Sequence, residues 1–246
     1  MDTLMFYTLG KSFAPANWNL DHFPGTNRLY YVTGGEAWYW EGDKRFPFMP
    51  GNFYFFPQNL PFSVGQNPES PIDHLYFDFT SIPSLFASSV ISISPQQDPV
   101  LLQMCESAAQ LLSEQPPSLT CAKLLCQAMT QRLLETKQIS CVTDPRIHSA
   151  LEIIHNQYSQ PITISQIAQS LHLETNYFIR LFRQYMQITP YQYLLQHRLR
   201  CAARLLCDGV SVTQAAYKCG FSDGAAFSHA MKKLLGVSPS QYCTSK

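Results

Sequence analysis

The sequence predicts a two-domain chain of the α+β class, with a strand-rich N-terminal domain and an all-helical C-terminal domain. Twenty of the 32 aromatic residues fall in the first 80 positions, whereas a helical pattern occurs twice after residue 160. Charge divides in the same way. Residues 1–140 hold 7 Lys+Arg and 12 Asp+Glu, and residues 141–246 hold 10 and 5, although the 246-residue chain is neutral overall. Because DNA affinity rests largely on phosphate neutralisation, the basic second half suggests a polyanion partner.

Between Arg28 and Phe79 the pattern is one of short strands separated by turns rich in Gly and Pro. The pair Gly34-Gly35 predicts a two-residue hairpin between the first two strands. Strands at this spacing are typical of a β-sandwich or barrel. The predicted strands are Arg28–Thr33, Glu36–Trp40, Asn52–Phe56, Phe62–Val64 and Ile72–Phe79.

The last of these strands alternates between two kinds of side chain. Successive side chains of a strand point to opposite faces, which places Leu75, Phe77 and Phe79 on one face. We expect that face to pack in the core. The other face, with His74, Tyr76 and Asp78, is expected to line a cavity.

Two helices are predicted after the strands, over Pro99–Ser113 and Ser118–Thr136, separated by Pro116-Pro117. Each has a stripe of residues at helical spacing, more apolar in the first helix than in the second, that fits either a dimer seam or packing against the strands. The stripes are Leu102, Cys105, Ala109 and Leu112 in the first helix, and Leu119, Lys123, Cys126, Thr130 and Leu133 in the second. Residues 137–144 lack periodicity, so we expect an interdomain linker there, between domains at 1–136 and 145–246.

The C-terminal half contains an internal repeat. Thr163–Gln166 recurs as Ser211–Gln214, and each is a Ser/Thr-x-x-Gln capping box that marks a helix start. Thr189–Gln192 and Ser238–Gln241 are two further boxes with Pro at the first helical position. The stripe Ile164, Ile167, Ala168, Leu171 recurs as Val212, Ala215, Ala216, Cys219. Each copy therefore predicts a helix, a short turn and a second helix, which is the helix-turn-helix arrangement for DNA binding.

In the second helix of the first copy, Phe178, Leu181, Phe182 and Tyr185 form an inward stripe with helical spacing. Its outward residues have the side chains that read bases: Asn pairs with adenine and Arg with guanine. We expect Asn176 and Arg180 to read bases, Ile179 to contact a thymine methyl, and Thr175 and Arg183 to contact phosphates. An ordinary solvated face is the weaker alternative.

The equivalent helix of the second copy, about Asp223 to Leu234, has shorter outward side chains that reach few base edges. We therefore expect phosphate contacts from Lys232 and Lys233 and one base contact from His229, with Ser228 also facing outward. Most sequence discrimination should come from the first copy.

These residues resemble the AraC/XylS family of transcription regulators. The resemblance is carried by Ala215–Asp223, Phe227-Ser228 and Gly236–Tyr242, and it covers about the last 100 residues. It implies two helix-turn-helix units bridged by a helix at about Pro190 to Cys207. His172 stands where the family usually has a turn glycine, and Ala215, Met231 and Cys243 also depart from its pattern.

The first half resembles the cupin-like effector domain that precedes many such DNA-binding domains, through Met49–Asn52 and His74–Phe79. The resemblance implies a β-barrel that holds a small molecule. We expect the pocket to be lined by Tyr30, Glu36, Trp38, His74 and Tyr76, since aromatic faces with a few polar groups suit a sugar or another small polar ligand. For any single aromatic residue, ordinary core packing is equally consistent with the pattern.

Cofactor and enzyme functions are not indicated. The chain has no His-x-His pair of the metal-binding cupins and no Cys-x-x-Cys pair, so neither a metal site nor catalytic residues are expected. Its eight cysteines fit free thiols in a reducing cytoplasm, and no signal or membrane-spanning stretch is present.

The function implied is that of a ligand-responsive, sequence-specific regulator of transcription. The expected partners are double-stranded DNA, a small effector, a second copy of the chain in a homodimer, and RNA polymerase. Two alternatives remain: a constitutive DNA-binding protein whose barrel only dimerises, and a cupin-type enzyme with an appended domain.

Overall fold

The computed structural model describes residues 4–14, 18, 20–22, 26–58, 60, 62–141, 144–235 and 238–239. The chain divides into two compact units, Met1–Val142 and Thr143–Lys246. Strands are the main elements of the first unit and helices those of the second, so the predicted α+β class is confirmed. Within the expected linker, Ser140–Cys141 forms strand β11, which pairs with β9 (Leu85–Phe86) in the first unit.

The other strands of the first unit form two antiparallel sheets. The five-stranded sheet has the order β1-β8-β3-β6-β10, and the four-stranded sheet has the order β2-β7-β4-β5. The larger sheet consists of β1 (Leu4–Phe13), β8 (Asp73–Ser81), β3 (Asn27–Gly34), β6 (Phe53–Phe56) and β10 (Ile91–Ile93). The smaller consists of β2 (Leu20–His22), β7 (Phe62–Gln66), β4 (Ala37–Glu41) and β5 (Lys44–Pro47).

The hairpin predicted at Gly34-Gly35 is wrong. β3 pairs with β6 and β8, whereas β4 pairs with β5 and β7, so the two strands lie in different sheets. Gly35 has a φ of +84°, and a Cβ at this position would collide with the backbone of Pro71. The glycine therefore permits a close crossing of the chain from one sheet to the other.

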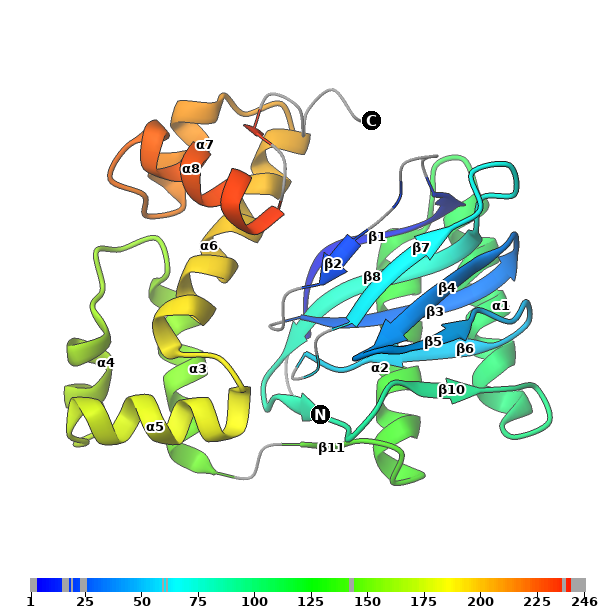
Figure 1. Cartoon of the computed structure of the whole chain (residues 1–246), viewed down its shortest axis with the longest axis horizontal. Helices are drawn as coiled ribbons and strands as arrows, with labels where there is room; N and C mark the ends of the chain where they lie inside the picture. The colour runs from blue at the N-terminus through cyan, green and yellow to red at the C-terminus, as the bar shows by residue number, and fades with distance from the viewer. Residues whose placement is uncertain are drawn as a thin grey trace. The chain divides into compact units, whose positions relative to one another are not determined.

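The first unit has three layers, and the five-stranded sheet is the middle one. One face of this sheet meets the four-stranded sheet through an aromatic interior, with Tyr30, Tyr54 and Phe56 opposite Tyr39 and Phe62. The other face packs against α1 (Pro99–Ser113) and α2 (Leu119–Glu135), which lie behind the strands in Figure 1. Leu75, Phe77 and Phe79 are fully buried on the helix side, as predicted from strand alternation.

Most residues of the two stripes that fit a dimer seam are buried within the chain. Leu102, Cys105 and Ala109 of α1, and Cys126 and Leu133 of α2, belong to the core formed with the sheet. Their helical spacing reflects this packing, so a dimer cannot use them. Leu119, at the start of α2, is exposed instead.

The described elements of the second unit are all helices, and Figure 1 shows α6 joining two groups of them. The first group is α3 (Pro145–Gln157), α4 (Ile164–Ser170) and α5 (Thr175–Met186). The second group is α7 (Val212–Lys218) and α8 (Gly224–Leu235), and α6 spans Pro190–Cys207. Thus α4–α5 and α7–α8 form the two predicted helix-turn-helix units.

The predicted helix starts agree with the observed caps. Thr163 and Thr189 each accept a hydrogen bond from the backbone N–H three residues later, and the Gln side chains there bond back to the cap, which completes two capping boxes. Ser211 accepts from the N–H of Gln214. The predicted box at Ser238–Gln241 lies partly outside the described residues.

Both copies bury the stripes that the repeat predicts. Phe178 and Phe182 of α5 are fully buried, as are Phe227 and Met231 of α8. Met186 completes the stripe of α5, and Tyr185 is only half-buried. In α3 the buried residues are Ile147, Ala150, Leu151, Ile154 and His155.

The turns of the two helix-turn-helix units allow a matched test of backbone strain. His172 has a φ of +56° and Gly220 a φ of +78°. Residues with a Cβ are strained in this left-handed region, whereas Gly is not. We expect His172→Gly to raise the free energy of unfolding by roughly 0.5 kcal/mol, because the relieved strain exceeds the added flexibility of the unfolded chain. Urea denaturation followed by circular dichroism measures this change.

Gly220→Ala is the opposing control. Its Cβ would lie 2.6 Å from the carbonyl oxygen of Tyr158, so we expect a loss of at least about 1 kcal/mol. A stabilising effect of Gly220→Ala, or a destabilising effect of His172→Gly, would contradict this account of the turns.

Candidate nucleic-acid interface and ligand pocket

The outward face of α5 carries the predicted base readers. Asn176, Arg180 and Arg183 are exposed, opposite the buried Phe178 and Phe182. Thr175 and Ile179 are half-buried, at the edges of this face. All five candidates therefore lie on one side of the helix or at its border, as a helix that enters a DNA groove requires.

The start of α5 is held by contacts that the sequence did not reveal. The Glu174 carboxylate caps the helix by accepting from the N–H of Tyr177 at 2.8 Å. The phenol oxygen of Tyr177 accepts a hydrogen bond of 2.9 Å from Nη1 of Arg146 in α3. Nε and Nη2 of Arg146 also donate to Asp144, at 3.0 and 2.7 Å. The bonds to Arg146 hold the pKa of Asp144 below its ordinary value.

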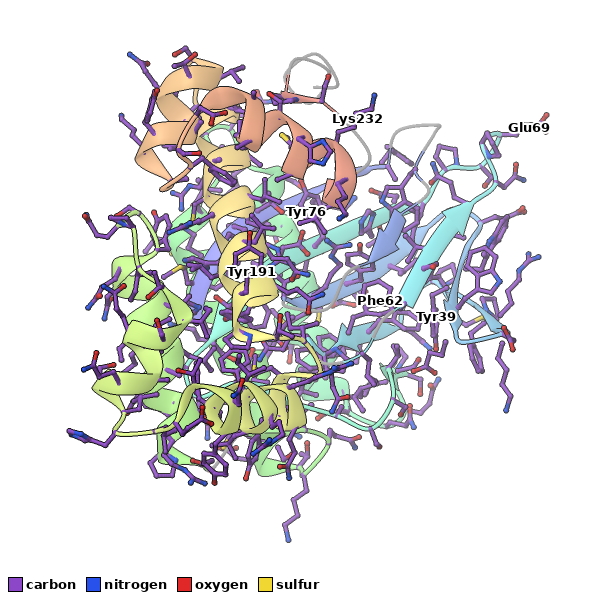
Figure 2. All side chains as sticks on the ribbon, turned by 60° about the vertical axis from the view of Figure 1, so that its left-hand side comes forward. Tyr39, Phe62, Glu69, Tyr76, Tyr191 and Lys232 are labelled. Atoms are coloured by element: carbon purple, nitrogen blue, oxygen red, sulfur yellow. The ribbon has the colours of Figure 1, made fainter. Side chains whose placement is uncertain are left out.

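The outward face of α8 is less suited to reading bases. His229, Lys232 and Lys233 are exposed, and Lys232 extends from the helix in Figure 2. Ser228 is half-buried, and its hydroxyl donates to the Gly224 carbonyl at 2.8 Å, so this hydroxyl already has a partner within the helix. The two lysines and His229 remain the candidates for contacts with DNA.

A buried polar cluster joins α3 to α6 beneath these faces. The imidazoles of His155 and His197 stack with centroids 4.5 Å apart, and the ring of Tyr158 meets His197 edge-on at 4.8 Å. Nε2 of His155 lies 2.8 Å from the hydroxyl of Tyr193. Burial lowers the pKa of His155 to about 4 and holds that of His197 well below its ordinary value. Both rings are therefore neutral at pH 7.

In the first unit, three of the five predicted pocket residues come together in the interior between the sheets. The ring of His74 lies 4.7 Å from that of Tyr30 and 5.5 Å from that of Tyr76. Trp18, which the sequence did not single out, lies 5.7 Å from His74. His74 is 4% exposed, and its Nδ1 makes no hydrogen bond with the described residues. Burial lowers the pKa of His74 to about 4, so the imidazole is an uncharged polar group in an aromatic surrounding.

The other two predicted pocket residues are not brought to this interior. Ala37 and Tyr39 of β4 face inward, which places Trp38 on the opposite face of the strand, over Gly65 of β7. There the guanidinium of Arg45 lies 4.0 Å from the Trp38 ring. Glu36 is exposed and accepts a hydrogen bond from Asn67 at 2.9 Å. The assumed hairpin register led to both errors, because it assigned the wrong face of β4 to the interior.

An ion pair lies near the aromatic interior. The Arg28 guanidinium of β3 donates from two nitrogens to Asp78 of β8, which also accepts from Thr8 of β1 at 3.1 Å. Burial alone would lower the pKa of Arg28, but Asp78 raises it above its ordinary value. Burial also raises the pKa of Tyr30 to about 12. The pair ties three adjacent strands together at this position.

The described residues contain no cluster of three His, Cys, Asp or Glu side chains that could hold a metal ion. The cysteines among them are free thiols: Cys105, Cys121, Cys126, Cys141, Cys201 and Cys219. None of the described helices is both long enough and apolar enough to cross a membrane.

Comparison with known proteins identifies the helical unit. Residues 167–245 match the helix-turn-helix domain family. The Msm operon regulatory protein of Streptococcus mutans is 33% identical over 101 residues, which cover 41% of this chain and 36% of that protein. The regulator AlkR of Acinetobacter baylyi is 34% identical over 42% of this chain and 34% of its own length. This chain therefore spans about a third of the length of these two curated relatives.

Longer matches cover nearly the whole chain. An HTH-type transcriptional regulator of Haemophilus influenzae, itself uncharacterised, is 24% identical over 92% of this chain and 89% of its own length. The crystal structure of ToxT from Vibrio cholerae superposes with a TM-score of 0.68 at 12% identity, over 99% of this chain and 98% of ToxT. ToxT with a bound unsaturated fatty acid superposes with a TM-score of 0.64. The two-unit fold is therefore that of ToxT.

The buried histidines predict a pH-dependent stability of the helical unit. The folded-state pKa of His155 is depressed, so its contribution is complete above the ordinary value of 6.5 and is lost as the pH falls from 6.5 towards 4. We expect a loss of about 1.4 kcal/mol per pH unit for each buried histidine in this range. Urea denaturation at pH 7 and at pH 5 measures the loss.

His155→Gln should reduce this pH dependence, because it removes one of the histidines with a lowered pKa. The difference between variant and wild type isolates the helical unit, since His74 titrates in both proteins. His148→Gln serves as the control, because His148 is only half-buried and lies on the same helix. An unchanged pH dependence in His155→Gln would show that the pKa of His155 in the folded unit is not lowered.

Proposed function

The C-terminal unit of this chain is an AraC-type helix-turn-helix domain, and from this premise we propose that the protein is a ligand-responsive, sequence-specific regulator of transcription. The observation that carries the proposal is the outward face of α5, where Asn176, Arg180 and Arg183 are exposed together. These are side chains that read adenine and guanine edges or bind phosphates. The relatives and the fold are those of transcription regulators rather than of enzymes.

In this proposal the two helix-turn-helix units have unequal roles. Asn176 and Arg180 read bases, Ile179 contacts a thymine methyl, and Thr175 and Arg183 bind phosphates. From α8, Lys232 and Lys233 bind phosphates and His229 makes one base contact. The Ser228 hydroxyl donates within the helix and remains available to DNA as an acceptor. Base discrimination therefore lies mainly in α5, and α8 adds affinity.

The effector would bind in the interior of the first unit. His74 supports this placement, because a buried imidazole nitrogen without a partner is costly unless a ligand or water satisfies it. Tyr30, Tyr76 and Trp18 surround it with aromatic faces. A sugar or another small polar molecule would satisfy these groups. A fatty acid is the second candidate, since the ToxT fold accommodates one.

Binding would act by shifting an equilibrium between two states of the chain, and it requires a different affinity for each state. We place the protein in the cytoplasm, as a homodimer on paired half-sites, with RNA polymerase as a further partner. The exposed side of α2 supports a dimer contact through Leu119 and Leu124, which are 44% and 59% exposed. A constitutive regulator whose first unit only dimerises is the alternative.

Selection from a random pool of DNA duplexes tests the DNA-reading part of the proposal. Full-length protein, at physiological salt and with competitor DNA, should recover a sequence motif. If no motif is recovered, either with or without the candidate effectors, the basic unit binds DNA without reading it.

Two substitutions then separate base reading from phosphate binding on that motif. Arg180→Ala should cost roughly 1 to 3 kcal/mol at one base position and leave binding to scrambled DNA nearly unchanged. Lys232→Ala should weaken binding to motif and scrambled DNA alike, because phosphate contacts carry no sequence information. Equal losses on both DNAs for Arg180→Ala would remove this residue from the base readers.

A thermal-shift measurement tests the ligand pocket. We expect one of L-arabinose, D-glucose or oleate to raise the melting temperature, because a ligand that binds only the native state stabilises it by mass action. His74→Gln should weaken that response at least about tenfold in ligand concentration, since the buried polar contact is lost.

Trp38→Phe is the matched control. Trp38 lies on the outer face of the sheet, so its replacement should leave the response unchanged. Loss of the response in Trp38→Phe would place the ligand outside the interior, and no response to any of the three probes in the wild type would favour the constitutive alternative.

A further inference from the structure

Arg198 of α6 is bonded to the end of α3, whereas its position on a bridging helix fits a solvated cation or a phosphate ligand equally well. Its Nε donates to the carbonyl oxygen of Tyr158 at 2.7 Å, and its Nη2 donates to that of Gln160 at 2.7 Å. Tyr158 is the C-cap residue of α3, and Gln160 follows two residues later. A guanidinium at this helix end satisfies carbonyls that lack partners within the helix, and its charge suits the negative end of the helix dipole.

The second helix-turn-helix unit, α7–α8, packs against the same contact. Gly220 forms the turn between α7 and α8, and a Cβ there would lie 2.6 Å from the carbonyl oxygen of Tyr158 and 3.0 Å from Nε of Arg198. The turn therefore lies directly against the pair formed by Arg198 and the end of α3. Three segments meet at one guanidinium: the end of α3, the middle of α6 and the α7–α8 turn.

Aromatic and apolar side chains pack around Tyr158 at this point. The Tyr158 ring packs edge-on against His197 of α6. It also packs against the core that α6 forms with α7 and α8. Arg198 is half-buried, so its two bonds are partly shielded from water. The α7–α8 pair thus has a second point of attachment in addition to its connection through α6.

We propose that Arg198 is a positioning residue that fixes the distance and angle between recognition helices α5 and α8, and thereby sets the spacing of the two subsites on DNA. This inference rests on the proposed function, since it assumes that both helices engage one duplex. If they enter the major groove on one side of the DNA, their subsites lie one helical turn apart, about 10 base pairs. A change of one base pair then rotates one subsite away from its helix by about a tenth of a turn.

The test uses the full chain and the motif recovered by selection, with one base pair inserted or deleted between its subsites. The measured quantity is the ratio of the dissociation constants on altered and original spacing. Wild type should discriminate by at least about tenfold, because a misplaced α8 loses its contacts. Arg198→Lys should reduce the ratio below about threefold, since an ammonium group cannot reproduce the planar two-pronged contact with both carbonyls.

Arg200→Lys is the matched control on the same helix. Nη2 of Arg200 lies 3.5 Å from Oε1 of Gln196, a contact within α6, so the spacing ratio should remain that of wild type. A variant that is merely less stable weakens binding at every spacing and leaves the ratio unchanged. The ratio therefore distinguishes positioning from stability.

Three outcomes would overturn the inference and leave the proposed function standing. These are a wild type that binds both spacings alike, a recovered motif with a single subsite, and a folded Arg198→Lys protein that keeps the wild-type ratio. Should Arg198→Lys fail to fold, Arg198→Gln is measured in the same way and the wild-type ratio still decides the first outcome. Failure to recover any motif would instead contradict the proposed function.

Discussion

The helical unit depends on a single constraint: α6 must pack into two separate cores at once. Near its start, Tyr193 and Leu194 are buried beside the helices of the first group, and further along, Leu199 and Ala202 belong to the core with α7 and α8. A helix rises about 1.5 Å per residue with a fixed rotation. The number of residues between the two buried sets of α6 therefore determines how far apart the two helix-turn-helix units lie. Polar contacts on α6, above all that of Arg198, then restrict rotation about it.

The strand-rich unit follows a different principle, because its central sheet is covered on both faces. On the helix side the contacts are apolar, whereas the interior between the sheets also holds His74. Burying a ring nitrogen without a hydrogen bond, as at Nδ1 of His74, costs free energy that apolar residues would avoid. The uncharged imidazole therefore distinguishes this face of the sheet from the apolar face that packs against the helices.

The described start of the helical unit is bonded to α5 through Arg146. Asp144 caps α3, and through Arg146 it is connected to the hydroxyl of Tyr177 in α5. The first turn of α5 and the described start of this unit are thus parts of one hydrogen-bonded network.

The sequence by itself determined the α+β class, the repeat and the faces of α5 and α8, because these follow from local capping and from periods of two and 3.6 residues. Thr163 and Phe178 could be assigned in this way without any knowledge of the fold. The tertiary structure alone decided which strands pair. The chain crosses between the two sheets at Gly34-Gly35, where a hairpin was expected. Trp38 therefore lies on the outer face of its sheet and not in the interior. The tertiary structure also showed that Arg198 is bonded internally, since hydrogen bonds between residues about 40 positions apart leave no periodic trace in the sequence.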